Sequence, residues 1–372
     1  MNLMVKNKQS RFCHLIGLPA IILLQGLLVC PAAFTQDSTP CTEADQDCLQ
    51  QLYATHPARS IRSWQAIQAL PLERRIMRAP NRLIEFLKID NQLHGFPNHP
   101  RAAKIPRKFL KGLKAAIAEL PAEVITLIDR RLMGIFLVED LGGTGMTDYV
   151  FNDEGKAVGG YVVLDVGVLS LPANQWATWK ENTPFIAEPE YVIRARIETD
   201  LDNNLKQALQ YILLHEFGHI ASIGAGIHPP WSDWNCQVDP PAQYPFFELS
   251  WQLSGEENCA VVSKFDASVF SYRTDVIYYF GARLQASVSP VVYEQLEQTN
   301  FPSLYAATSP YDDFAESFVS WVHQKMMHKP FEIQISRKEQ YLTEFRGCWN
   351  TPRCAAKKQI LTELLSDAHA NP

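Results

Sequence analysis

Two histidines and a glutamate stand at a spacing that can bind a metal ion and activate water. The segment His215-Glu216-Phe217-Gly218-His219 places its two imidazoles four residues apart. On an α-helix such residues project from one face, one turn apart, so both can bind a single zinc ion. Glu216 would then lie beside the metal position that the protein ligands leave open. The pattern predicts a zinc site, and two buried histidines held by hydrogen bonds explain it less well.

A catalytic zinc ion needs a third protein ligand, and two acids further along the chain are candidates. A histidine at the short spacing H-E-x-x-H-x-x-G-x-x-H is excluded, because Ala225 stands there. His228 follows His219 by nine residues, in a proline-rich segment that is more typical of a loop. Asp312 and Glu316 are four residues apart, so one could bind zinc while the other accepts a hydrogen bond from a ligating imidazole. The residues alone leave both acids open as the third ligand.

Two helices must position these side chains. Residues 202–221 carry apolar residues at helical spacing, which predicts a buried helix around the two histidines. A second helix is predicted from Pro310 to about residue 328, because Ser309 is a good N-cap and proline is favoured in the first turn. Geometry lets an acid of the second helix reach a metal ion held by the first.

Two motifs resemble those of the anthrax lethal factor-like zinc endopeptidases, which are gluzincin-type zincins. One is His-Glu-x-x-His at 215–219, and the other is Tyr305 followed by Asp312 and Glu316. The resemblance implies that Asp312 is the third zinc ligand and that Glu316 supports a ligating histidine. It also implies that Tyr305 stands at the reaction centre. The family ligand is usually Glu, whereas this chain has the shorter Asp312.

The remaining elements predict an α+β protein. Residues 135–138 and 161–170 are rich in β-branched residues and predict strands of a small sheet, and the glycines at 142–145 predict a turn between strands. We expect a mainly helical region at 36–133, either a separate lobe or the front of the catalytic fold. A zincin-like metallopeptidase domain is expected at 134–331, followed at 332–372 by a mostly charged helical tail with a disulfide.

The N-terminal residues predict export. Residues 1–35 contain three basic residues, then an apolar run that is short for a membrane span, then small residues suited to cleavage. This is the pattern of a signal peptide. Cys30 suggests a lipoprotein instead, but Val29 and Pro31 beside it disfavour lipidation. We therefore expect a periplasmic or secreted protein with no membrane span after cleavage.

Six further cysteines agree with an oxidising compartment. Their proximity in sequence predicts three disulfides, 41–48, 236–259 and 348–354. A zinc site made of cysteines is disfavoured, because none of the spacings is C-x-x-C.

The charge argues against nucleic acid as a partner. Removal of residues 1–35 would change the formal net charge from −6 to −9. One basic run lies at 101–114, but it alternates with apolar residues at helical spacing, so we expect it to be the solvated face of a helix.

The expected function is that of an exported zinc metalloendopeptidase acting on protein or peptide substrates. Glu216 would be the general base, and Tyr305 would stabilise the oxyanion. An extended substrate would pair with an edge strand, which we place within 161–170. The alternatives are a zinc-binding toxin-like or interaction module without turnover, and a zinc amidase acting on non-peptide amides.

Overall fold

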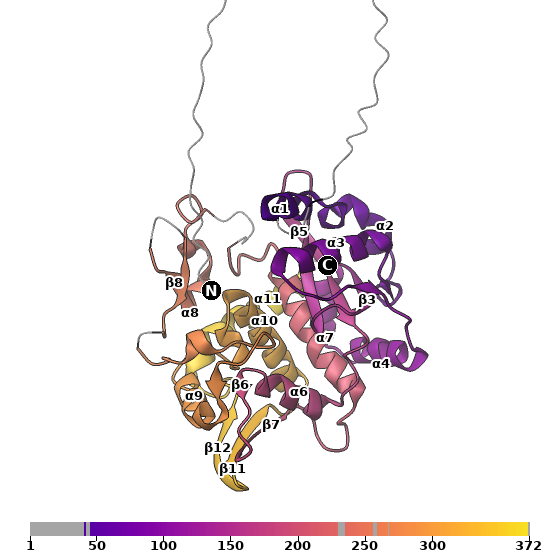
Figure 1. The fold of residues 1–372 in the computed structure, drawn as a ribbon. Helices are drawn as coiled ribbons and strands as arrows, with labels where there is room; N and C mark the ends of the chain where they lie inside the picture. The colour runs from indigo at the N-terminus through magenta and orange to yellow at the C-terminus, as the bar shows by residue number, and fades with distance from the viewer. Residues whose placement is uncertain (1–40, 42–44, 230–234, 256–258, 267, 371–372) are drawn as a thin grey trace, which may run out of the picture. The chain divides into compact units, whose positions relative to one another are not determined.

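The computed structural model describes residues 41, 45–229, 235–255, 259–266 and 268–370. The predicted signal peptide at 1–35 lies outside the described residues. Thr42–Pro372 forms one compact unit, in which helices pack with several small sheets (Figure 1). The predicted α+β class is confirmed. In the part of the chain that is described, no helix is both long and apolar enough to cross a membrane.

The largest sheet has five strands. Its main path has the order β1-β3-β5-β4, and β2 also pairs with β3. β1 and β5 run parallel to β3, whereas β4 is antiparallel to β5 and β2 is antiparallel to β3. The strands are β1 (Ile76–Arg78), β2 (Arg101–Ala102), β3 (Leu132–Glu139), β4 (Gly145–Phe151) and β5 (Ala157–Asp165).

Two predicted strands are parts of this sheet. The strand expected at 135–138 lies in β3, and the one expected at 161–170 begins in β5, which ends at Asp165. The glycines between them lie at the turn that leads into β4, and Gly142 has a φ of 102°. The sheet crosses the boundary predicted at residue 134, because β1 and β2 come from the upstream region.

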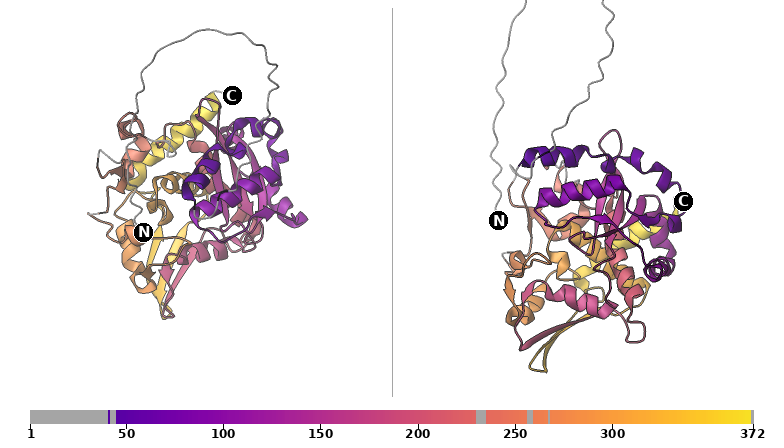
Figure 2. Two further views of the ribbon diagram at one scale, coloured as in Figure 1. Left: turned by 45° about the horizontal axis from the view of Figure 1, so that its top comes forward. Right: turned by 45° about the vertical axis from the view of Figure 1, so that its right-hand side comes forward.

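Different helices cover the two faces of the sheet, because successive side chains of a strand point to opposite faces. Phe136 and Val138 of β3 are buried in a cluster with Trp64 on one face. Ile135 and Leu137 are buried in a second, larger cluster on the other face. The first face meets α1 (Gln46–Thr55), α2 (Gln65–Gln68) and α3 (Asn81–His94), and the second meets α4 (Arg107–Ala118), α5 (Ala122–Asp129) and α7 (Leu205–Ser222) (Figure 2).

The rest of the chain surrounds α7 with helices and smaller sheets. The remaining helices are α6 (Ala173–Asn182), α8 (Pro245–Ser250), α9 (Ser289–Leu296), α10 (Pro310–Trp321), which continues as the π-helical turn η8 (Val322–Met326), and α11 (Ala355–Ala370). The smaller sheets are β6 (Phe185–Ile186) with β10 (Leu284–Gln285), β8 (Trp251–Leu253) with β9 (Val261–Ser263), and β7 (Tyr191–Arg196) with β11 (Glu332–Arg337) and β12 (Gln340–Arg346). Short 3₁₀ helices are η1 (Pro57–Arg59), η2 (Ile61–Ser63), η3 (Leu72–Arg74), η4 (Pro241–Gln243), η5 (Arg273–Asp275), η6 (Ala286–Val288), η7 (Tyr305–Ala307) and η9 (Pro352–Cys354).

The helical tail predicted for 332–372 is wrong in its first part. β11 and β12 form an antiparallel hairpin there, and β11 also pairs with β7. Ile333 and Ile335 are buried between polar neighbours, which is the period of two that a half-buried strand requires. The charges that favoured a helix therefore lie on the outer side of a strand. Only α11 is helical as predicted.

Two predicted disulfides are confirmed, Cys236–Cys259 and Cys348–Cys354. Cys41 and Cys48 are disulfide-bonded as well. Stable disulfides are typical of proteins that fold in oxidising compartments.

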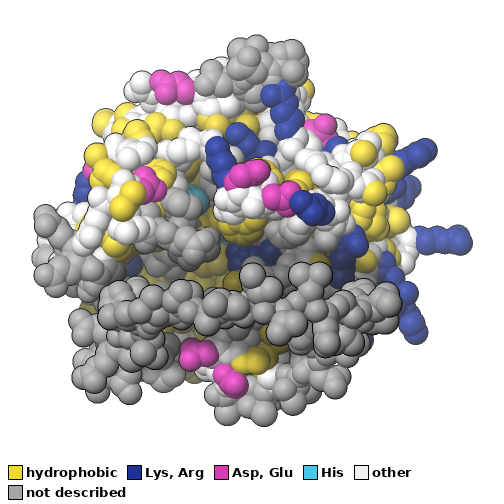
Figure 3. Space-filling model, turned by 90° about the horizontal axis from the view of Figure 1, so that it is seen from above, with side chains coloured by type: hydrophobic (Ala, Val, Ile, Leu, Met, Phe, Trp, Pro, Cys, Tyr) yellow, Lys and Arg dark blue, Asp and Glu magenta, His cyan; other side chains and the backbone are white. Residues whose placement is uncertain are grey.

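The basic run at 101–114 lies where the sequence predicts it. Lys108, Lys111 and Lys114 of α4 are exposed, whereas Phe109 and Leu113 of the same helix are buried. The solvated helix face is confirmed. On the face of the molecule seen in Figure 3, Lys and Arg side chains project along one edge.

α7 and α10 approach each other closely at Gly218. A Cβ atom added to Gly218 would lie 2.7 Å from the Cα of Ala315 and 3.1 Å from its carbonyl oxygen. Backbone atoms cannot swing aside as the end of a long side chain can, so this contact needs a glycine. The approach also sets how far the acids of α10 lie from the histidines of α7.

Replacing Gly218 with Ala is expected to destabilise the fold. The new methyl group must push α10 away, and overpacking of this kind costs about 1–3 kcal/mol. The higher helix propensity of Ala, worth ~1 kcal/mol, offsets part of this cost. The variant should therefore have a lower Tm in thermal unfolding followed by circular dichroism.

Gly112→Ala in α4 is the matched control. An added Cβ at Gly112 meets no atom within 4 Å, so the same substitution should stabilise this helix by about 0.5–1 kcal/mol. If Gly218→Ala unfolds at or above the Tm of Gly112→Ala, the two helices are not in contact at this glycine.

Candidate metal centre

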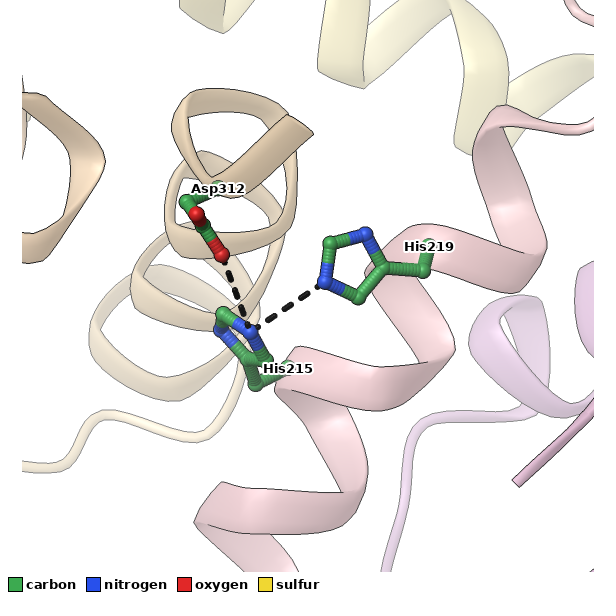
Figure 4. A group of neighbouring side chains, drawn as sticks. All are labelled: His215, His219 and Asp312. Atoms are coloured by element: carbon green, nitrogen blue, oxygen red, sulfur yellow. Dashed lines mark hydrogen bonds and ion pairs between the residues drawn. The ribbon is translucent and has the colours of Figure 1, made fainter. Parts of the chain in front are cut away.

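Two histidines of α7 and one acid of α10 point towards a common position (Figure 4). Nε2 of His215 lies 3.3 Å from Nε2 of His219 and 3.8 Å from Oδ1 of Asp312. One ligand atom from each of the three residues lies within 4.8 Å of the other two. Two nitrogens bound tetrahedrally to one zinc ion, with bonds of about 2.05 Å, are separated by about 3.3–3.4 Å. The spacing and the chemistry of these atoms therefore fit a single zinc-sized ion.

The local structure of α7 holds the two histidines in place. The helix begins after Asn204, whose side-chain oxygen accepts a hydrogen bond from the backbone N–H of Gln207. Most of its residues are buried, because it packs against both the large sheet and α10. A helix enclosed in this way keeps His215 and His219 one turn apart.

The start of α10 orients Asp312. The N-cap Ser309 accepts a hydrogen bond from the backbone N–H of Asp312 at 3.1 Å. The hydroxyls of Ser309 and Thr308 donate to Oδ2 of Asp312 at 2.7 and 3.1 Å. Oδ1 is thereby left to face His215. Burial raises the pKa of the Asp312 carboxyl, and His215 and Ser309 oppose that rise only in part.

Glu316 holds His215 from the side away from the metal position. Its Oε1 lies 3.0 Å from Nδ1 of His215, so His215 carries a proton on Nδ1 and directs the lone pair of Nε2 towards the shared position. Glu316 also accepts hydrogen bonds from Lys180 at 3.1 Å and from Ser303 at 2.6 Å. Burial alone would raise the pKa of Glu316, but Lys180 and His215 lower it to about 2.

Glu216 lies beside the three donors. The hydroxyl of Thr147 on β4 donates to its Oε2 at 2.7 Å. A Cβ added to Gly145, on the same strand, would lie 3.3 Å from Oε1 of Glu216, so the glycine leaves room for this carboxylate. Burial raises the pKa of Glu216, and His215 and Thr147 oppose the rise. A carboxylate whose pKa is raised is a better proton acceptor, which suits it to accept and return a proton.

Tyr305 packs directly on the first histidine. Its ring is stacked on that of His215 with the centroids 5.5 Å apart. The rings of Tyr278 and Tyr279 lie at 4.7 and 5.9 Å from it. Burial raises the pKa of the Tyr305 phenol well above its ordinary value, so the hydroxyl keeps its proton and can donate a hydrogen bond. The predicted site residues thus all lie together.

A cleft of about 950 Å³ opens over these residues. The candidate metal-binding residues of α7 and α10 line one part of it, and β4 lines another. Residues of α1 and η1, His56 between them, and His94 of α3 line a further part. A smaller pocket of about 150 Å³ adjoins the cleft at His215 and Glu216, and its lining includes five aromatic side chains: Trp176, Tyr211, Tyr279, Phe280 and Tyr305.

The predicted docking strand within 161–170 is wrong. β5 lies between β3 and β4, so neighbouring strands already use its backbone groups on both sides. β4 is an edge strand of the sheet and lies next to Glu216. Ser60 covers the far end of β4 through an isolated bridge to Phe151. The edge that a substrate could use is therefore the first part of β4.

The N-terminal helices belong to the same packed unit as the cleft. Trp64, Leu83, Phe86 and Leu87 from this region are fully buried against the sheet. Removing them would uncover one whole face of the sheet. The region is therefore an integral part of the packed unit.

Sequence reasoning missed the residues that support the site, namely Lys180, Thr147 and Ser303. Thr147 and Ser303 carry no sequence signal, because their roles depend on contacts 69 and 13 residues away. Lys180 had a weak signal. It follows Trp176 by four residues, so it lies on the buried side of an amphipathic helix, where a lysine needs a partner. His228, which sequence reasoning disfavoured as a ligand, lies with its Nε2 3.0 Å from the hydroxyl of Ser222.

Comparisons with protein-family models, with curated proteins and with solved structures found no match for this chain. The resemblance to the lethal factor-like endopeptidases stays a prediction based on two sequence motifs.

Proposed function

We propose that this protein is an exported zinc-dependent metalloendopeptidase with a zincin-like catalytic domain. One observation carries the proposal: ligand atoms of His215, His219 and Asp312 converge next to Glu216, beside the accessible edge of β4. A cleft of about 950 Å³ lies over this group and gives a substrate access to it. The disulfides support export, since such bonds persist mainly outside the cytosol.

Each residue has a distinct task in this proposal. Zinc bound at the three donors would lower the pKa of water and polarise the peptide carbonyl. Glu216 accepts the proton of the attacking water on its carboxylate and then passes it to the leaving amine. The hydroxyl of Tyr305 donates a hydrogen bond to the oxyanion that forms on the carbonyl. Thr147 keeps the Glu216 carboxylate aligned, and the backbone of β4 pairs with the substrate.

Digestion of a peptide library by the purified mature protein tests the proposal. The protein should contain about one zinc ion per chain, because the described residues offer a single group of three donors. Mass spectrometry should detect cleavage inside the peptides. A strong chelator should abolish cleavage and added zinc should restore it, because the three donors alone cannot activate water.

Two outcomes would contradict the peptidase and favour its alternatives. Stable zinc binding with no cleavage of any peptide would indicate a binding module without turnover. Cleavage restricted to small cell-wall amides, with all library peptides left intact, would indicate an amidase.

A further inference from the structure

Lys180 is a buried cation close to the metal centre. It lies near the end of α6 and its side chain is 5% exposed. Burial of an ammonium group is unfavourable unless the group is paired and hydrogen-bonded. The groups that pair with the Lys180 ammonium therefore make its burial possible.

Two acids and the rings of Tyr278 and Tyr305 surround the Lys180 ammonium. Nζ lies 3.1 Å from Oε1 of Glu316 and 3.5 Å from Oε1 of Glu181. It also lies 4.6 Å from the centre of the Tyr305 ring. Lys180 thus contacts two of the side chains that pack on His215, since Glu316 accepts a hydrogen bond from Nδ1 and Tyr305 stacks on the imidazole.

Lys180 is itself held in place. Oε2 of Glu181 accepts hydrogen bonds from the hydroxyls of Tyr278 and Tyr293, at 2.8 and 2.9 Å. All three residues are buried. The neighbouring acid therefore has a fixed position, and through it the ammonium is anchored by a second carboxylate besides that of Glu316.

We propose that Lys180 is a positioning residue of the metal centre, which acts through Glu316 to hold His215 in its ligating orientation. The ammonium fixes Oε1 of Glu316 at the point where it meets Nδ1 of His215. It also offsets the negative charge of a carboxylate that lies one helical turn from Asp312. The inference rests on the zinc binding proposed above and adds a residue to it.

A second buried lysine that pairs with an acid of α10 provides a matched control. Lys357 of α11 is 0% exposed and forms an ion pair with Asp313. Asp313 also accepts hydrogen bonds from Trp251 and Ser317, on the side of α10 that packs against α8 and α11. Both lysines are thus buried and paired with an acid of α10, but only Lys180 of the two faces the metal centre.

The test compares the zinc affinity and the thermal stability of Lys180→Met and Lys357→Met. Zinc dissociation constants are measured by competition with a fluorescent chelator. Lys180→Met should weaken zinc binding by about 10–100-fold, which is typical when the residues that orient a metal ligand are lost. Lys357→Met should lower the Tm and leave zinc affinity unchanged. Equal zinc affinity in the wild type and Lys180→Met, or an equal loss in both variants, would overturn the proposal.

A double-mutant cycle tests whether Lys180 acts through Glu316. In a Glu316→Ala chain, Lys180→Met should weaken zinc binding much less than it does in the wild type, because the side chain that links Lys180 to His215 is already absent. If Lys180→Met weakens zinc binding by the same factor with and without the Glu316 side chain, Lys180 does not act through Glu316. If Lys180→Met does not fold, Lys180→Gln replaces it in the cycle, because Gln keeps a neutral donor on a side chain one atom shorter. The expected result and the result that would overturn the proposal stay the same.

The failure of this inference can be told from the failure of the proposed function. A wild-type chain that binds no zinc would refute both. A wild-type chain that binds zinc and cleaves no peptide would refute the peptidase alone, and the affinity comparison would still decide the role of Lys180.

Discussion

Replacing Glu216 with Gln is expected to abolish most peptide hydrolysis while zinc stays bound. The three ligand atoms belong to His215, His219 and Asp312, so the substitution leaves them intact. The amide cannot accept the proton of the attacking water, and general-base catalysis contributes on the order of 10²–10⁴-fold. The decrease should appear in kcat/KM for a peptide from the library digest, with unchanged zinc content and Tm.

Thr147→Val provides a graded comparison for this prediction. It removes the hydrogen bond to Oε2 of Glu216 and keeps the carboxylate. Activity should fall by less than in Glu216→Gln, because the base is still present but less well aligned. Turnover close to the wild-type rate in Glu216→Gln would mean that another group accepts the proton.

Asp312→Ala and Glu316→Ala are expected to differ in metal content. Oδ1 of Asp312 faces the common position, so Asp312→Ala should purify essentially free of zinc. Glu316 touches Nδ1 of His215 and not the metal position, so Glu316→Ala should keep zinc with affinity or activity reduced by about 10–100-fold. Elemental analysis of the purified variants, followed by zinc titration, measures the difference.

Asp313→Asn separates loss of metal from loss of fold. Asp313 pairs with Lys357 on another side of α10, so its replacement should lower the Tm and leave the zinc content unchanged. If Glu316→Ala is the metal-free variant and Asp312→Ala keeps its zinc, the two acids have exchanged roles.

The site was predictable from sequence where local signals place the residues. The spacing of His215 and His219 needs only an α-helix to bring the imidazoles together, and Ser309 followed by Pro310 marks the start of α10. The spacing of four positions from Asp312 to Glu316 puts both acids on one face of that helix. The structure distinguishes the two acids. Asp312 faces the shared position, and Glu316 accepts a hydrogen bond from Nδ1 of His215.

The parts that sequence did not predict depend on contacts between distant segments. β11 carries charges that also suit a helix, and its pairing with β7, more than 130 residues away, makes it a strand. β5 looked like a docking strand, but the parallel crossover from β3 places it inside the sheet and leaves β4 at the edge. Lys180 is separated from Glu316 by 136 residues, so only the packed structure pairs the two.

The strand order of the large sheet has a consequence for how the protein is made. All five of its strands lie between Ile76 and Asp165, so a chain delivered from its amino terminus can complete the sheet before α7 is synthesised. Until then, Ile135 and Leu137 have α4 and α5 beside them but lack the part of their cover that α7 provides. Asp312, the third donor, is synthesised only with α10. The proposed catalytic centre is therefore completed well after the sheet, and a chain that ends before α10 lacks its third donor.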